Sequence, residues 1–115
     1  QCETSAVERR HAMDVIQECM EMISFGGDAK SLALLAIKQS REGKHEEAAA
    51  TMEKAEESLA KSHQAHTNLL SYDAKNQDLQ VTIFMVHAAD HLNAAETVFV
   101  LAKELILLHK EVKHV

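Results

Sequence analysis

The chain has 115 residues, enough for one domain with a single core and too few for two. Hydrophobic residues make up 46%, aromatic residues only 3%, and proline is absent, a composition of strong helix formers that predicts an all-α fold. The net charge of −6 and the lack of a basic cluster argue against a nucleic-acid or anionic-membrane surface, and no apolar run approaches the ~18–20 residues that cross a bilayer.

The two cysteines, Cys2 and Cys19, follow neither a disulfide pattern nor a metal-binding pattern. We therefore expect two free thiols, as in a protein of the reducing cytoplasm. The sequence begins without methionine and shows no signal-peptide core, and we expect residues 1–5 to be disordered or to be remnants of processing. Residues 1–115 are thus expected to form a single helical domain.

The first predicted helix runs from about Val7 to Glu42. Gly26-Gly27 interrupts it, since each glycine costs roughly 1 kcal/mol relative to alanine inside a helix, and Asp28 is suited to cap a restart. We expect one helix kinked at Gly26-Gly27, or two stacked halves, ending at Gly43 in the left-handed conformation. Apolar residues of its first half repeat at helical spacing: Met13, Ile16, Met20 and Ile23.

The second predicted helix covers about His45 to Ser71, and its seam has the alternating four- and three-residue spacing of a helical bundle. The seam comprises Ala48, Met52, Ala55, Leu59, Ser62, His66 and Leu69. It becomes polar at Ser62 and His66, and buried polar groups are costly unless they are paired, so this part of the helix is a candidate border of a site. A polar linker over 72–78 follows, with Asp78 as a candidate helix cap.

The third predicted helix extends from about Leu79 to Lys113. Its apolar residues cover a wider arc than the ~100° stripe of an isolated bundle helix, which predicts a second buried face and therefore an oligomer. Lys110, Lys113 and His114 lie in the last turn, where positive charge suits the helix dipole. The predicted architecture is an antiparallel up-down-up bundle of three helices. One seam of the third helix comprises Phe84, Ala88, His91, Ala95, Val98, Ala102, Leu105, His109 and Val112.

Titratable residues concentrate in the third helix, within the sequence Val86-His87-Ala88-Ala89-Asp90-His91-Leu92. His87 and His91 are four residues apart and therefore share one face, with Asp90 three residues after His87. One interpretation is an ordinary surface pair of histidines. Asp90 is either exposed to solvent or lies on a symmetry axis, where copies of the carboxylate would need a hard cation to neutralise them.

A metal site is a second interpretation, because histidines at this spacing can chelate zinc from a helix. The further ligands within the chain would be His63 and His66 of the second helix. An H-E-x-x-H motif is absent, since Ala88 stands where the catalytic glutamate would be, which argues against a hydrolytic zinc site.

Several motifs and their spacing resemble one family, the IIA proteins of the lactose/cellobiose/chitobiose class of the bacterial sugar phosphotransferase system. The similarity covers nearly the whole chain after the first dozen residues. The motifs that carry it are Gly27-Asp28-Ala29-Lys30-Ser31, Lys38-Gln39 with Gly43, His63 with Thr67, and Val86 to Leu92.

The resemblance implies a homotrimer of three-helix subunits in the cytoplasm. It implies that His87 is the phosphorylated nucleophile, which accepts phosphate from the histidine of HPr and passes it to a cysteine of a IIB partner during disaccharide uptake. His91 matches a second, supporting active-site histidine. Asp90 matches an aspartate near the threefold axis, where three carboxylates hold one divalent cation per trimer, most simply Mg²⁺.

The chemistry of the residues agrees with a phosphocarrier, because an imidazole with an ordinary pKa of about 6.5 is neutral and nucleophilic near pH 7. His91 and His66 are candidate donors to the phosphorylated ring. Two positions depart from the family, which usually has glutamine in place of Ala89 and of His66. The alternative function is a metal-binding or regulatory bundle that uses His63, His66, His87 and His91 as its ligands, and a plain interaction bundle is a third reading.

Overall fold

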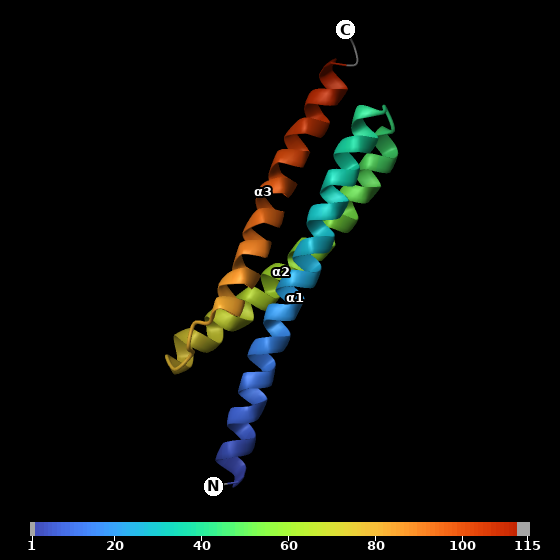
Figure 1. The fold of residues 1–115 in the computed structure, drawn as a ribbon. Coiled ribbons are helices and arrows are strands. Elements are labelled where there is room, and N and C mark those ends of the chain that lie inside the picture. Colours follow the sequence, from blue (N-terminus) through green and yellow to red (C-terminus); the bar gives the residue numbers. More distant parts are fainter. Residues whose placement is uncertain (1, 113–115) are drawn as a thin grey trace.

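The computed structural model describes the backbone of residues 2–112 and the side chains of residues 15–112. It contains three helices, α1 (Cys2–Arg41), α2 (His45–Asn76) and α3 (Ile83–Val112), and no strand within residues 2–112. The helices run up, down and up along a rod of 71 × 20 × 18 Å (Figure 1). The predicted all-α, up-down-up bundle is confirmed.

Helix α1 is continuous and starts earlier than predicted. It begins at Cys2, so the backbone of residues 2–5, for which disorder or a processing remnant was expected, is helical; these residues contain no glycine or proline to break a helix, and Gln1 lies outside the described residues. Gly26 and Gly27 both lie within the unbroken helix, and Figure 1 shows no sharp bend along α1. The predicted kink, and a restart at Asp28, are therefore wrong.

The buried face of α1 also differs from the predicted one. Ile16 and Met20 are 56% and 53% exposed, and the side chain of Met13 lies outside the described residues. Small side chains dominate the face that is buried, and they allow the helices to approach closely. That face comprises Cys19, Met22, Gly26, Ala29, Ala33, Ala36 and Ser40.

The turn between α1 and α2 has the predicted conformation. Gly43 has φ 82°, and its N–H donates to the carbonyl of Ser40 at 3.0 Å. The N–H of Lys44 donates to the carbonyl of Gln39 at 2.9 Å, which completes a Schellman motif. The prediction of a left-handed glycine that ends the first helix is confirmed.

The second connection is shorter than the predicted linker. Helix α2 continues to Asn76, because residues 72–76 contain no helix breaker, and it ends at Gln77 in the left-handed conformation, φ 53°. Thr82, rather than Asp78, caps α3: its Oγ1 accepts a hydrogen bond from the N–H of Met85 at 3.2 Å. Both ends of the connection are thus set by short-range hydrogen bonds.

Helix α1 packs against both other helices, whereas α2 and α3 contact each other much less. The polar seam position Ser62 is fully buried in this interface, and its Oγ donates to the carbonyl oxygen of Met22 at 2.9 Å. That bond satisfies the hydroxyl, so Ser62 is a structural residue that joins α2 to α1. None of the helices over residues 2–112 combines the length and the apolarity needed to cross a bilayer.

Candidate functional site

The candidate site lies in the first three turns of α3, just after the Thr82 cap. The sequence from Ile83 onward has no glycine or proline, so the helix is regular and places His87 and His91 one turn apart on the same face. His87 is exposed and His91 is partly buried. The predicted juxtaposition of the two imidazoles is confirmed.

The two rings contact each other directly. The Nε2 atoms of His87 and His91 are 3.1 Å apart, a hydrogen-bonding distance in which one nitrogen donates and the other accepts. The ring centroids are 4.5 Å apart and the planes meet at 86°. Because a protonated pair would place two donors face to face, this contact requires at least one neutral imidazole.

Two residues from other helices support this site: Ser62, which the sequence singled out as a candidate border of a site, and Gly26, which it did not. Gly26 is buried where α1 meets α3, and a Cβ on it would lie 3.5 Å from the backbone oxygen of His91. Ser62 lies beside the same glycine, at 3.4 Å from that Cβ position. The signal that could have revealed Gly26 is its register, since it falls four residues after Met22 and three before Ala29 on the buried line of α1.

Asp90 is exposed in the single chain. It follows the same face of α3 as two leucines that are also exposed, Leu101 at 56% and Leu108 at 49%, because offsets of 11 and 7 residues are close to whole turns. A carboxylate and a row of apolar side chains thus share one uncovered surface. The first alternative for Asp90, exposure, describes the isolated chain.

His66 does not join the histidine pair. It lines a cavity of about 220 Å³ whose walls are mainly apolar side chains of α2, α3 and the connection between them. Ala89 lines the same cavity and lies about 200° around α3 from His87, on the opposite side of the helix. The two positions that depart from the family pattern therefore line the same cavity, on the far side of α3 from His87 and His91.

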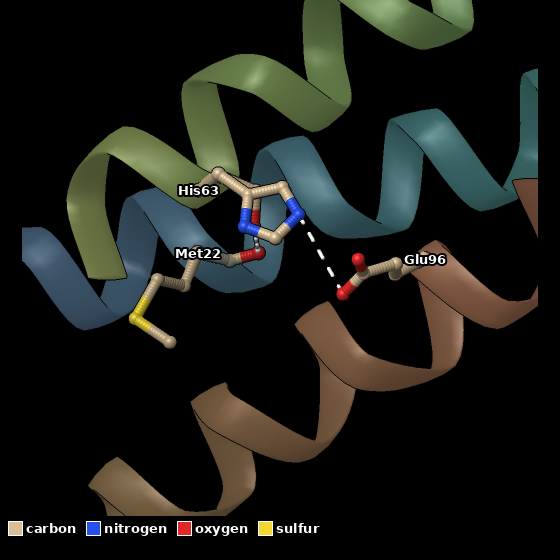
Figure 2. Close-up of polar contacts among 4 residues, drawn as sticks. Met22, His63 and Glu96 are labelled. Atoms are coloured by element: carbon tan, nitrogen blue, oxygen red, sulfur yellow. Dashed lines mark hydrogen bonds and ion pairs between the residues drawn. The ribbon is translucent and has the colours of Figure 1, made fainter. Parts of the chain in front are cut away.

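His63 has a different partner again. Its Nε2 lies 3.6 Å from Oε2 of Glu96, so that it bridges α2 and α3 (Figure 2). Both side chains are about half exposed, which limits such a pair to ~1 kcal/mol or less. Among the side chains of residues 15–112, no three histidines, cysteines or carboxylates gather closely enough to hold a metal ion. The predicted four-histidine ligand set is therefore not assembled within the chain.

The resulting arrangement is suited to carry a group on an exposed imidazole. His87 offers a ring nitrogen at the surface, and the partly buried His91 offers a second nitrogen 3.1 Å away. A neutral imidazole is a nucleophile toward phosphorus, and a neighbouring N–H can neutralise part of the charge of an attached phosphoryl group. The geometry thus fits transfer of a charged group between proteins better than conversion of an enclosed small molecule.

Comparisons with known proteins agree with this interpretation. The family model described as the lactose/cellobiose-specific IIA subunit of the PTS system matches residues 17–110. The lactose-specific EIIA component of the PTS system of Staphylococcus epidermidis is 36% identical over 91 residues, which cover 79% of this chain and 88% of that protein.

Two solved structures are similar along most of their length. The PTS cellobiose-specific enzyme IIA from Bacillus anthracis matches with a TM-score of 0.83 and 33% identity, over 87% of this chain and 92% of that chain. A second match is a chain in the solution structures of the IIA(Chitobiose)–HPr complex of the N,N'-diacetylchitobiose branch of the Escherichia coli phosphotransferase system. It has a TM-score of 0.75 and 33% identity, over 86% of this chain and 96% of that chain.

Proposed function

The chain belongs to the lactose/cellobiose-specific IIA subunits of the sugar phosphotransferase system, and we propose that it carries a phosphoryl group on His87. The observation that carries this proposal is the exposed imidazole of His87, whose Nε2 faces Nε2 of His91 at 3.1 Å. The donor is HPr, which the similar chitobiose protein binds in its solved complex. The acceptor is a cysteine of a IIB component.

In the first step, the lone pair of Nε2 of His87 attacks the phosphorus of the phosphohistidine of HPr. The phosphorus–nitrogen bond to HPr breaks as the bond to His87 forms, and a proton passes from the His87 ring to the HPr ring through water. In the second step, the thiolate of the IIB cysteine attacks the same phosphorus, and His87 regains its proton. The chain converts no small molecule of its own.

His91 supports both steps through its ring N–H. With Nε2 of His91 protonated, its hydrogen bond selects the tautomer of His87 that has a lone pair on Nε2, and this hydrogen bond breaks as the lone pair attacks phosphorus. After transfer, the same N–H is placed to donate to a phosphoryl oxygen. His66 has no part in this proposal, because it lines the cavity on the other side of α3.

The working unit is a homotrimer built on the exposed face of α3, where Asp90 shares a surface with Leu101 and Leu108. Three copies of Asp90 on the axis supply hard oxygen ligands of the kind that Mg²⁺ prefers, and such a cation would offset their mutual repulsion. The exposure of Asp90 leaves its carboxylate free to be shared between chains.

The sugar served is a disaccharide of the lactose, cellobiose or chitobiose type, as in the proteins to which the chain is similar. With HPr and a IIB component as its partners, the proposed location of the chain is the cytoplasm. The alternative function, a metal-binding bundle with a four-histidine site, is disfavoured by the separate positions of His63 and His66.

The test is the intact mass of the protein after incubation with phosphoenolpyruvate, enzyme I and HPr. We expect a gain of one phosphoryl group in the wild type and in His63→Ala, and none in His87→Ala with unchanged helical circular dichroism. His63 is a suitable control because it is a histidine whose partner, Glu96, is separate from the pair. Labelling that persists in a folded His87→Ala variant would show that the site is assigned to the wrong residue.

A further inference from the structure

The separation of the two imidazole nitrogens suits a hydrogen bond between them, and it also suits a metal ion bound to both. Zinc binds histidine nitrogen at about 2.0–2.1 Å, so two nitrogens on one ion are about 3.3 Å apart in tetrahedral geometry and about 2.9 Å apart at adjacent octahedral positions. The Nε2 atoms of His87 and His91 are 3.1 Å apart, between these two values. The helix backbone therefore already holds them at chelating distance.

From this geometry we infer that His87 and His91 form a two-histidine site for a borderline divalent transition-metal ion such as Zn²⁺, which prevents phosphorylation of His87 while it is bound. The rings meet at 86°, so chelation requires the two side chains to rotate until both lone pairs point at one ion. His87 is exposed, so its ring has room to turn and water can complete the coordination.

The ligand type separates this site from the carboxylate at position 90. Imidazole nitrogen favours zinc, copper and nickel ions, whereas carboxylate oxygen favours magnesium and calcium ions. Asp90 is not grouped with the two histidines in a three-ligand cluster. An excess of Mg²⁺ therefore leaves the two-histidine site available to Zn²⁺.

The regulatory part of this inference rests on the proposed function. A metal ion and a phosphoryl group both form their bond with the same lone pair of Nε2 of His87, so each excludes the other. The two effects are linked thermodynamically. Bound zinc lowers the equilibrium constant for phosphorylation of His87, and phosphorylation lowers the affinity for zinc by the same factor. The metal site itself, however, requires only the geometry of the unphosphorylated chain.

The first experiment titrates the full chain with ZnCl₂ by calorimetry in buffer that contains excess Mg²⁺. We expect one zinc site per chain, weakened about tenfold or more in His87→Asn and in His91→Asn, because each variant removes the second arm of a chelate. The matched control His63→Asn removes a half-exposed histidine outside the pair and should bind zinc as the wild type does.

Nitrogen-15 spectra of the histidine rings identify the ligating atoms, and the Nε2 signals of His87 and His91 should shift together with zinc. No binding, or binding that both Asn variants retain, would overturn the metal site, since the chain has other histidines and cysteines that could hold zinc. This outcome is independent of phosphorylation, because no phosphoryl donor is present.

The second experiment mixes the protein with purified phospho-HPr, with and without zinc. Slower labelling with zinc, restored by a chelator, is expected. Labelling at an unchanged rate with zinc bound at the two histidines would overturn the regulatory part. If the protein is not labelled even in the absence of zinc, the proposed function is contradicted. The metal site is then judged by the calorimetric titration alone.

Discussion

The backbone of Gly26 in α1 lies against the backbone carbonyl of His91 in α3: a Cβ on this glycine would be 3.5 Å from that oxygen. The neighbouring glycine has no such contact, since a Cβ on Gly27 would have no heavy atom within 4 Å. One of the two adjacent glycines thus sets the spacing of α1 and α3 beside the candidate site, and the other faces open space.

The two glycines should respond differently to substitution. Gly27→Ala should raise the free energy of unfolding by about 1 kcal/mol, because alanine has the higher helix propensity and meets no obstacle. Gly26→Ala should be tolerated, since 3.4–3.5 Å is ordinary van der Waals contact, whereas Gly26→Leu should destabilise by about 1–3 kcal/mol through overpacking. Urea denaturation gives the free energy of unfolding of each of the three variants. A Gly26→Leu variant as stable as wild type would contradict the close packing of α1 on α3.

The oligomer interface is tested by two neighbouring residues of α3 with matched exposure. Leu101 is 56% exposed and Val100 is 54% exposed, but they point about 100° apart around the helix, and only Leu101 follows the face of Asp90. Leu101→Glu should convert the proposed trimer to monomers, because three buried carboxylates would repel one another, while Val100→Glu should leave it intact. Light scattering after size-exclusion chromatography gives the mass. Equal behaviour of the two variants would argue against this face as the interface.

Asp90 itself should be dispensable for assembly. Replacing a buried charge cluster by apolar side chains is often neutral or stabilising, so Asp90→Leu should remain trimeric and should no longer gain thermal stability from added Mg²⁺. Thermal unfolding with and without Mg²⁺, combined with the mass in solution, tests both parts. Dissociation of Asp90→Leu into monomers would contradict the role given to this carboxylate.

The thiol of Cys19 should make the free energy of unfolding fall as the pH rises above about 9. Burial, with a smaller contribution from the charge of Glu18, raises the pKa of its thiol above the ordinary value of 9.0. As the pH rises, the thiol is deprotonated in the unfolded chain before it is deprotonated in the folded chain. Its contribution to the free energy of unfolding is therefore fully present below about pH 9 and is lost as the pH rises from there through the folded-state pKa. Urea midpoints of wild type and Cys19→Ala from pH 7 to pH 10.5 should diverge in slope above pH 9. Parallel curves would contradict a protonated, buried thiol.

Substitutions that fill or enlarge the cavity lined by His66 and Ala89 should change the free energy of unfolding without changing the rate of phosphorylation. Ala89→Leu should stabilise the chain by about 1 kcal/mol by filling part of the roughly 220 Å³ space, and His66→Ala should destabilise it by enlarging that space. Both variants should be phosphorylated at the wild-type rate, because the cavity lies across α3 from His87. Slower labelling of a folded His66→Ala variant would restore His66 as a supporting residue.

The sequence by itself determined the number, order and direction of the helices, and the pairing of His87 with His91. These features depend on short-range physics: helix-forming composition, a glycine in the left-handed conformation at Gly43, and a spacing of four residues that returns to the same face. Resemblance to a family added the role of each residue, and the family match over residues 17–110 confirms the membership.

Only the tertiary structure decided which residues are buried and which act together. The glycine pair was expected to kink α1 or divide it into two stacked halves, but packing on α3 outweighs about 2 kcal/mol of helix propensity and uses Gly26 as a contact. Ser62 and His66 share a seam in sequence, yet Ser62 bonds to the backbone of α1 and His66 lines a cavity. Such outcomes depend on how far apart the helices pack and how they are rotated, and these quantities are set by contacts between residues distant in the sequence.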